Sequence, residues 1–342
     1  VVNDAEISMS ITANAGDLEA GDGTTITGSA DAENDSMTIT AKSGADIATS
    51  GRITNVNSIT VVDVGDNTDP AEADASGSDF SIDLAGYATE LTIDASALDA
   101  ANVDDAAGGN SDDVIDSDDA SEEKLTITGV SAAALTVTGG SGVDSITAST
   151  GIDNLSGGAG DDTFIFGANL SYLDVVEGGA GDDEITLSGT QADVNFMKVS
   201  GVETVTLDGA ATNTLSAYFD ATGITTVNLD NNAVSTVVAS GVTNGITYVV
   251  KGAVNEDVTA GMGADFLVVT GGLLTADDVF DGGSGIDTIT LDNSAAGITA
   301  VVDLSDITNI EKIVVADADG DADDSAETIG LTFSALGDNG VN

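Results

Sequence analysis

The chain has 342 residues, of which 60 are acidic and 6 are basic, and its formal net charge is −54. A field of this sign repels phosphate backbones and anionic lipid surfaces, so we expect no nucleic acid partner and no direct membrane insertion. The chain contains no histidine and no cysteine, which excludes disulfides, thiolate metal sites and the Ser-His and Cys-His pairs of nucleophilic catalysis. We therefore expect the protein not to be an enzyme.

Hydrophobic residues nevertheless make up 41% of the chain, and the mean hydropathy is +0.16, which is higher than in disordered acidic tails. The apolar residues are small, with 4% aromatic residues and no tryptophan. The 42 glycines and the single proline divide the chain into short segments. This composition predicts a thin, regular interior built from stacked short strands.

Short segments that alternate threonine, serine or asparagine with isoleucine, valine or leucine occur along the whole chain. A period of two predicts β-strands that bury one face. Residues 1–107 are expected to form an N-terminal β-rich region, either a degenerate repeat or a separate domain. Helical periodicity is nearly absent, with single helical turns expected at 95–101 and 216–220. The clearest strand predictions are residues 25–27, 37–40, 59–62, 91–93, 125–128, 135–138, 204–207 and 225–229.

A nonapeptide of the form Gly-Gly-x-Gly-x-Asp-x-apolar-x recurs in the middle and C-terminal parts of the chain. Three glycines in four positions allow turn conformations that other residues avoid, the Asp places a carboxylate at a fixed point, and the apolar residue points into a core. Such a turn is suited to binding a hard cation through oxygen ligands. The perfect copies are 139–147, 157–165, 178–186 and 282–290, and the looser copies are 108–116, 148–156 and 260–268.

These nonapeptides resemble those of the RTX (repeat-in-toxin) family of secreted bacterial calcium-binding proteins, whose repeats wind into a parallel β-roll with calcium between the turns. The resemblance implies an all-β fold, with parallel β-roll or β-solenoid segments that carry calcium-binding Gly-Asp turns, in addition to the β-rich N-terminal region. It also implies several bound Ca²⁺ ions, because ligation by oxygen alone selects Ca²⁺ over Zn²⁺ or Cu²⁺. The candidate ligands are Asp113, Asp144, Asp153, Asp162, Asp183, Asp265 and Asp287, with Gly139, Gly157, Gly178 and Gly282 in the turns.

Consecutive nonapeptides of a β-roll form opposite half-turns, so copies two apart in sequence stack on each other. The resemblance therefore places Asp144 next to Asp162. The half-turn at 166–177 is lengthened, which makes Asp183 the next neighbour of Asp162 on the same side. Two or more calcium ions are expected along this stack, held by Asp carboxylates and by backbone carbonyls of the glycine-rich turns.

Further ligand candidates lie outside this stack. Asp153 is expected on the opposite side of the β-roll, and Asp265 is the expected neighbour of Asp287 across the intervening loop. The alternative for every one of these residues is that the glycines make plain tight turns and each Asp caps its own backbone.

The acidic segment at 317–324 resembles the beginning of an EF-hand calcium loop, with carboxylates at alternating positions. Asp319 and Asp321 are candidate ligands on this resemblance. The segment departs from the motif at Ala322, where glycine is usual, and at Thr328, where a bidentate glutamate is usual. An acidic surface loop is therefore the favoured interpretation.

A longer repeat contains the nonapeptides, because residues 157–187 parallel residues 260–291 with a single insertion. This duplication predicts an RTX-type β-roll unit at 108–207 and a second, related β-solenoid unit at 208–342. In such an architecture neighbouring repeats complete each other's core.

Acidic, cysteine-free chains rich in threonine, alanine, glycine and valine, with scattered RTX repeats, are similar to bacterial surface-layer and extracellular matrix proteins. The resemblance implies a calcium-dependent structural protein that assembles with itself into a sheet or filament outside the cell, after type I secretion. A cell-surface polysaccharide is a further candidate partner. We expect residues 1–13 to add as a strand to the open edge of a neighbouring copy. The alternative is a calcium-stabilised RTX adhesin or a ligand-binding module of a larger secreted protein.

Overall fold

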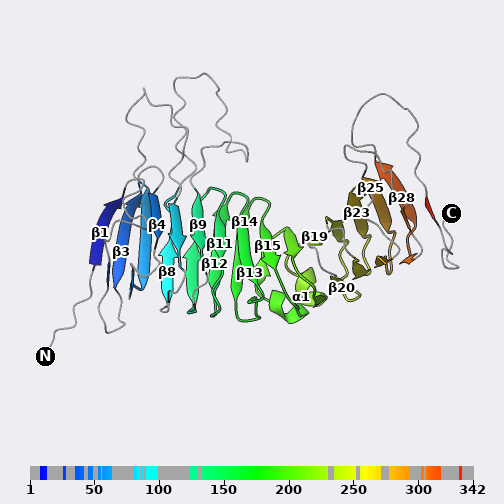
Figure 1. Cartoon of the computed structure of the whole chain (residues 1–342), viewed down its shortest axis with the longest axis horizontal. Coiled ribbons are helices and arrows are strands. Elements are labelled where there is room, and N and C mark those ends of the chain that lie inside the picture. The colour runs from blue at the N-terminus through cyan, green and yellow to red at the C-terminus, as the bar shows by residue number, and fades with distance from the viewer. Residues whose placement is uncertain are drawn as a thin grey trace, which may run out of the picture. The chain divides into compact units, whose positions relative to one another are not determined.

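The computed structural model of the chain is almost entirely parallel β-sheet wound into a β-solenoid, as the sequence predicts (Figure 1). The chain forms two compact units: the first contains residues 1–169 and 173–184, and the second contains residues 170–172 and 185–342. The structure describes residues 8–13, 26–27, 35–41, 45–48, 53–54, 56–63, 80–84, 87, 90–98, 124–129, 132–229, 235–251, 255–270, 277–292, 302–303, 306–316 and 331–332.

Two parallel sheets make up most of the first unit, and the chain passes from one to the other in successive half-turns. One sheet contains, in spatial order, β1 (Ser8–Ala13), β3 (Ser36–Ala41), β6 (Ser58–Asp63), β8 (Leu91–Asp94), β10 (Leu135–Thr138), β12 (Asn154–Ala159) and β14 (Val175–Ala180). The other contains β4 (Ala45–Ala48), β7 (Phe80–Asp83), β9 (Leu125–Thr128), β11 (Ser145–Thr147) and β13 (Thr163–Gly167). A separate short pair is formed by β2 (Ile26–Thr27) and β5 (Ile53–Thr54).

The alternating sequence determines which face each strand buries. In β9, Leu125 and Ile127 are completely buried, whereas Thr128 is exposed. Parallel pairing in register then places like residues on like, so that Val137 of β10 lies beside Ile93 of β8. Columns of aliphatic side chains therefore run through the interior, and each fully buried side chain stabilises the fold by roughly 1.5–3 kcal/mol relative to its exposed state.

The second unit is also built from two rows of parallel strands. One contains β15 (Glu184–Leu187), β17 (Thr204–Leu207), β19 (Thr226–Leu229), β21 (Thr247–Val250), β23 (Phe266–Thr270), β25 (Thr288–Asp292) and β28 (Lys312–Ala316). The other contains β18 (Thr212–Thr214), β20 (Thr236–Val238), β22 (Asp257–Thr259), β24 (Val279–Asp281) and β27 (Ile307–Thr308). The remaining short strands are β16 (Val199–Ser200) and the pair of β26 (Val302–Asp303) with β29 (Leu331–Thr332).

Two short helices pack against each other in the second unit. They are the 3-10 helix η1 (Asp193–Phe196) and the α-helix α1 (Ala217–Asp220), and the rings of Phe196 and Phe219 meet edge to face with centroids 5.2 Å apart. The helical turn predicted at 216–220 is confirmed, whereas η1 was not predicted because four residues are too few to show a helical period. Across the described residues, no helix is long and apolar enough to cross a membrane.

The helical turn predicted at 95–101 is not present in the described part of that segment, residues 95–98. A tight turn forms there instead, because Asp94 Oδ1 accepts hydrogen bonds from the backbone N–H of Ser96 at 3.2 Å and from its hydroxyl at 2.6 Å. A side-chain acceptor of this kind competes with helical hydrogen bonding.

The division into two compact units falls between residues 169 and 185. The boundaries predicted at 107 and 207 come from a repeat in the sequence. A division of the chain into compact units does not test whether the chain contains such a duplication. They therefore stay predictions.

Candidate functional site

Buried carboxylates connect successive coils of the first unit. Leu125 N–H donates to Asp144 Oδ1, Asp144 N–H donates to Asp162 Oδ1, and Asp162 N–H donates to Asp183 Oδ1, each at 2.8 Å. Each acid directly precedes a strand, so parallel pairing in register brings the acids to the same level of the solenoid. We call each such contact an acid rung: a carboxylate that accepts the backbone N–H of the equivalent residue one coil earlier. The predicted stacking of Asp144, Asp162 and Asp183 is present.

The opposite sheet of the first unit has acid rungs of its own. Asp153 Oδ1 accepts the N–H of Leu135 at 2.9 Å, which places Asp153 on the opposite side, as predicted. Asp174 Oδ1 accepts the N–H of Asp153 at 2.8 Å. Asp174 lies in the lengthened half-turn at 166–177 and was not predicted, because that half-turn lacks the glycines of the nonapeptide.

The second unit contains the predicted pair of Asp265 and Asp287. Asp265 N–H donates to Asp287 Oδ1 at 2.8 Å, Ile246 N–H donates to Asp265 Oδ1 at 2.7 Å, and Asp287 N–H donates to Glu311 Oε2 at 2.8 Å. Glu311 was not predicted, since no glycine-rich turn precedes it. Asp265 and Asp287 are almost completely buried.

On the other side of the second unit, two further acids of the same kind follow one another. Ser235 N–H donates to Glu256 Oε2 at 3.2 Å, and Glu256 N–H donates to Asp278 Oδ1 at 2.8 Å. Neither Glu256 nor Asp278 was predicted. Their only signal in the sequence is an acid two positions before a buried apolar residue, which is too common in a chain with 60 acids to single them out.

The second carboxylate oxygen distinguishes the rungs from one another. Asp144 Oδ2 accepts the N–H of Gly140 at 2.9 Å, and Asp265 Oδ2 accepts that of Gly261 at 3.0 Å, so these two acids also cap their own turns. Asp162 Oδ2 and Asp287 Oδ2 are buried and have no hydrogen-bond partner. The alternative to cation binding, that each Asp caps its own turn, therefore accounts for Asp144 and Asp265. It does not account for Asp162 and Asp287, whose charge is left uncompensated.

The nonapeptide glycines make room for these carboxylates. A Cβ at Gly139 would lie 2.2 Å from Asp144 Oδ2, one at Gly157 would lie 2.0 Å from Asp162 Oδ2, and one at Gly282 would lie 2.8 Å from Asp287 Oδ2. No side chain other than hydrogen fits at these distances. Gly178, the first glycine of the copy at 178–186, is buried in β14.

Burial controls the ionisation of the stacked acids. Desolvation raises the pKa of Asp162 to about 8; the N–H of Asp144 opposes this shift, and the carboxylates of Asp144 and Asp183 add to it. Desolvation also raises the pKa of Asp144 to about 7, opposed by its backbone hydrogen bonds and by the Lys124 ammonium. At neutral pH these carboxyl groups therefore either hold a proton or require a cation.

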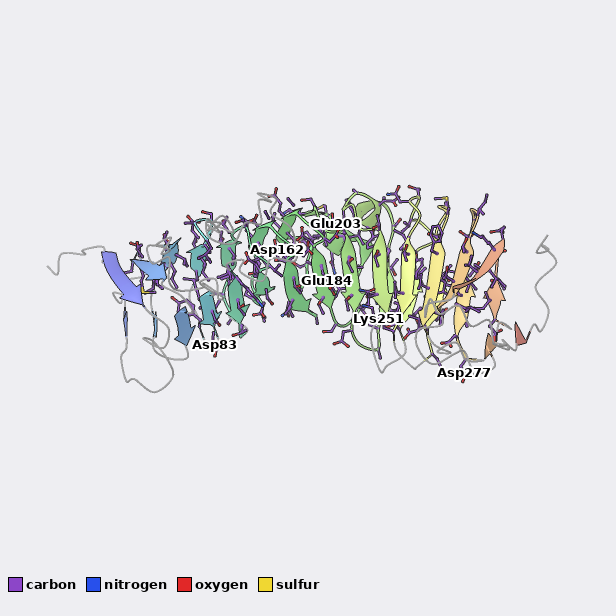
Figure 2. The ribbon with its side chains drawn as sticks, turned by 90° about the horizontal axis from the view of Figure 1, so that it is seen from above. Asp83, Asp162, Glu184, Glu203, Lys251 and Asp277 are labelled. Carbon is purple, nitrogen blue, oxygen red and sulfur yellow. The ribbon has the colours of Figure 1, made fainter. Side chains whose placement is uncertain are left out.

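The residues present fit a hard cation. The donors are all oxygen, the buried Oδ2 atoms of Asp162 and Asp287 lack partners, and glycine-rich turns bring backbone carbonyls to the same level. Among the described residues, no three acidic side chains are grouped closely enough to hold a metal ion. A cation at Asp162 would therefore depend on backbone carbonyls for most of its ligands. Figure 2 shows Asp162 among the strands of the stack, whereas Asp83 lies at its margin.

Three predicted ligands lie outside the described residues: Asp113, Asp319 and Asp321. Comparison with protein-family models, with curated proteins and with solved structures finds no match. The resemblance to RTX proteins therefore rests on the nonapeptides themselves.

Proposed function

We propose that the chain is a non-enzymatic, calcium-dependent structural protein that assembles with itself outside a bacterial cell, as a subunit of a surface layer, matrix or filament. The observation that carries this proposal is the stack of Asp144, Asp162 and Asp183, in which successive coils bury a carboxylate at the same level and Asp162 Oδ2 has no partner. A structural role suits such a fold because its surface is repetitive and its interior is filled by aliphatic columns.

Calcium supplies positive charge that the chain lacks. With 60 acidic and 6 basic residues, the chain repels itself unless cations condense on it. Asp144, Asp162, Asp183, Asp265 and Asp287 are the residues that would hold Ca²⁺, together with carbonyls of their turns. Metal binding then couples to folding: the chain stays loose in calcium-poor cytoplasm, which suits type I export, and closes its turns in millimolar calcium outside.

The end of the first unit supports self-assembly. β1 pairs with β3 on one side, and among the described residues no strand pairs with its other side. The two strands have nearly the same sequence, SMSITA and SMTITA, and pair in exact register from Ser8 with Ser36 to Ala13 with Ala41. β1 therefore presents to a second copy the kind of edge that β3 presents to β1.

Electron microscopy and light scattering of the purified chain test this proposal. We expect polymers in millimolar Ca²⁺ that disassemble in chelator, and loss of polymers when residues 1–13 are deleted. Polymers that persist in chelator would contradict the calcium dependence. Calcium-loaded monomers that bind a glycan on an array would contradict self-assembly and support the adhesin instead.

A further inference from the structure

The last described coil of the second unit carries a sequence that occurs twice earlier in the chain. Residues 307–315 read ITNIEKIVV, residues 53–61 read ITNVNSITV, and residues 199–207 read VSGVETVTL. Asn309 and Gly201 occupy the same position in two of these copies, and both have a left-handed backbone, with φ of 54° and 59°. A left-handed φ is uncommon outside glycine, so the likeness extends from the sequence to the backbone. The surroundings of the two earlier copies therefore indicate what the last one fits.

The strands that follow these three motifs differ in their pairing. β6 lies between β3 and β8, and β17 lies between β15 and β19. β28 pairs with β25 on one side, and among the described residues no strand pairs with its other side (Figure 1). The last coil thus has an open edge where the two earlier copies are covered by a further coil.

In the two earlier copies, the carbonyl of the residue just before the strand accepts a hydrogen bond from the next coil. Asn57 O accepts the N–H of Thr92 at 2.9 Å, and Glu203 O accepts that of Thr226 at 3.1 Å. Glu311 occupies this position in the last coil. Its carbonyl is therefore where the backbone N–H of a following coil would bind.

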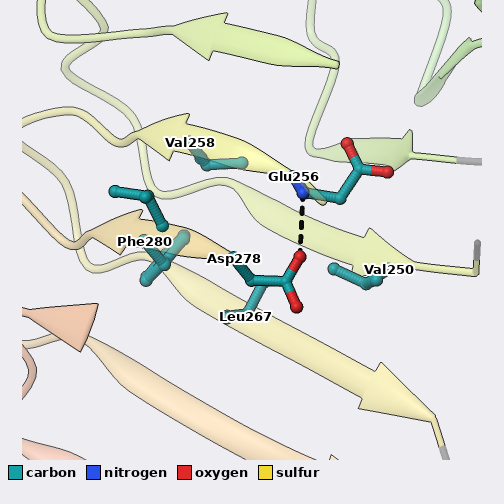
Figure 3. Close-up of a pocket in the computed structure, with 7 residues that line it drawn as sticks. Val250, Glu256, Val258, Leu267, Asp278 and Phe280 are labelled. Atoms are coloured by element: carbon teal, nitrogen blue, oxygen red, sulfur yellow. Dashed lines mark hydrogen bonds between the residues drawn. The ribbon is translucent and has the colours of Figure 1, made fainter. Parts of the chain in front are cut away.

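Two coils within the second unit show what a covering coil contributes (Figure 3). Asp278 of the later coil accepts the N–H of Glu256 at 2.8 Å, and Phe280 of β24 pairs in register with Val258 of β22. Both Val258 and Phe280 are almost completely buried. A covering coil thus supplies hydrogen-bond partners for the backbone and an apolar side chain for the interior.

The apolar interior lacks such a cover at β28. Ile59 and Val205 occupy the position of Ile313 in the two earlier copies, and both are completely buried. Ile289, the neighbour of Ile313 on β25, is completely buried as well, whereas Ile313 itself is partly exposed. The column of aliphatic side chains therefore ends open, and covering it would remove further apolar surface from water.

The backbone alternation shows which N–H groups of β28 face the open side. Lys312 donates its N–H to Asp287 O at 3.1 Å and so faces β25. Alternate residues of a parallel strand face opposite neighbours, which directs the N–H groups of Ile313 and Val315 to the open side.

The open edge of β1 is complementary to this edge. Ser58 donates its N–H to Asp35 O, so the first residue of β6 faces back toward β3. The register of β6, β3 and β1 then directs the N–H groups of Ser10 and Thr12 away from β3, to the open side of β1. In each parallel pair, the forward edge of the earlier strand meets the backward edge of the later one. β28 has an open forward edge, and β1 has an open backward edge.

We propose that the β28 edge of one copy docks on the β1 edge of a second copy, so that copies join head to tail into a polar filament with continuous parallel sheets. This inference rests on the proposed self-assembly and adds the partner surface and the polarity. Two β1 edges could pair with each other only as antiparallel strands, which would produce a closed dimer and no filament.

Proline substitutions that block one end at a time test the proposal. Proline has no N–H, and its ring obstructs an incoming strand. Val315→Pro blocks the β28 edge, and Ser10→Pro blocks the β1 edge. In millimolar Ca²⁺ each variant alone should stay monomeric, whereas an equimolar mixture should form a dimer of twice the mass and no polymer, because each variant keeps one intact end. Size-exclusion chromatography with light scattering measures these masses.

Val315→Ala and Ser10→Ala are the matched controls. Each removes the same side chain as the proline variant but keeps the backbone N–H, so both should form polymers like the unmodified protein. Circular dichroism checks that every variant is folded. Ile313→Pro and Thr12→Pro remove the other N–H group of each edge and replace a proline variant that does not fold.

Three results would overturn the proposal. Polymers of Val315→Pro alone would show that assembly does not use the β28 edge, as expected if residues after 316 of the same chain cover it. Dimers of Val315→Pro alone would indicate that two β1 edges pair. A mixture that stays monomeric would exclude head-to-tail docking. In contrast, an unmodified protein that forms no polymer in millimolar Ca²⁺ would contradict the proposed function itself.

Discussion

The stack of Asp144, Asp162 and Asp183 in the first unit and the pair of Gln191 and Asn213 in the second unit make the same contact between coils with different charge. Gln191 N–H donates to Asn213 Oδ1 at 3.0 Å, and Asp144 N–H donates to Asp162 Oδ1 at 2.8 Å. The hydrogen bond that holds adjacent coils in register therefore needs only a side-chain oxygen. The charge of the acid rungs is additional to this requirement.

The two contacts also differ in how fully they are satisfied. Gln191 and Asn213 are both 1% exposed, and the Gln191 side chain donates to Ser188 O at 3.4 Å and accepts from Asn195 Nδ2 at 3.0 Å. Asp162, equally buried, leaves Oδ2 without a partner. The contact between Gln191 and Asn213 needs no added proton or ion, whereas Asp162 Oδ2 gains a partner only when a proton or a cation binds.

The largest expected effect concerns the tight backbone contact at the acid stack. Gly160 and Gly223 both have φ +97, but a Cβ at Gly160 would lie 2.5 Å from Gly142 O, and one at Gly223 would lie 3.9 Å from its nearest neighbour, Val202 O. Gly160→Ala should destabilise the fold by about 3 kcal/mol, from strain and overpacking together. Gly223→Ala should cost only about 1–2 kcal/mol of strain. Urea unfolding measures both, and equal losses would contradict the difference in packing.

Substitution of Asp162 separates hydrogen bond from charge. Asp162→Ala leaves the buried N–H of Asp144 without an acceptor and should cost about 1–3 kcal/mol with or without calcium. Asp162→Asn keeps the acceptor and removes the buried charge, so we expect a higher Tm than the unmodified protein in chelator at pH 8 and a lower Tm in millimolar calcium. Thermal unfolding by circular dichroism measures both states. The same sign of change in both conditions would contradict a cation at this rung.

The reverse substitution makes an acid rung where no nonapeptide supports it. Asn213→Asp keeps the acceptor for Gln191 N–H but buries a carboxylate, which should cost about 1–2 kcal/mol at pH 8, since each unit of pKa shift is about 1.4 kcal/mol. Calcium should not restore this stability, because Asn213 follows no glycine-rich turn. Full recovery in calcium would show that any buried acid between coils can recruit the ion.

The remaining prediction is a pH dependence of the calcium-free protein. The pKa of Asp162 is raised from 3.8 to about 8 and that of Asp144 from 3.8 to about 7, so the folded state binds more protons than the unfolded state. Stability from these groups is therefore fully present below pH 3.8 and is lost as the pH rises to about 8. In high salt, Tm should fall by a few degrees between pH 5 and pH 8. The double variant D144N/D162N should show a flatter profile, and an unchanged slope would contradict the assignment.

Much of the fold could be predicted from the sequence because the same pattern recurs in every coil. Period-two segments identify strands, and the nonapeptide indicates where a half-turn ends in the copies that carry it. The stacking of Asp183 on Asp162 follows even across the lengthened half-turn at 166–177, since adding residues to a loop does not alter the level of the next strand.

The role of the carboxylates was harder to predict. The nonapeptide indicates an acid that faces a cation, but it does not show that Oδ1 is already engaged by a backbone N–H of the preceding coil. That contact depends on parallel register between residues 18 to 21 positions apart. The acids at Asp174, Glu256, Asp278 and Glu311 make the same contact without the glycines, so the motif could not reveal them.

The spacing between successive rungs is 18 residues from Asp144 to Asp162, 21 from Asp162 to Asp183, 22 from Asp265 to Asp287 and 24 from Asp287 to Glu311. One side-chain oxygen per coil therefore holds that coil in register with the preceding one, whatever the length of the loop that connects them. A gene for such a chain can lengthen a loop, or gain and lose whole coils, while the rise of the solenoid is preserved. The same property makes the loops natural positions for displaying foreign peptides at regular intervals.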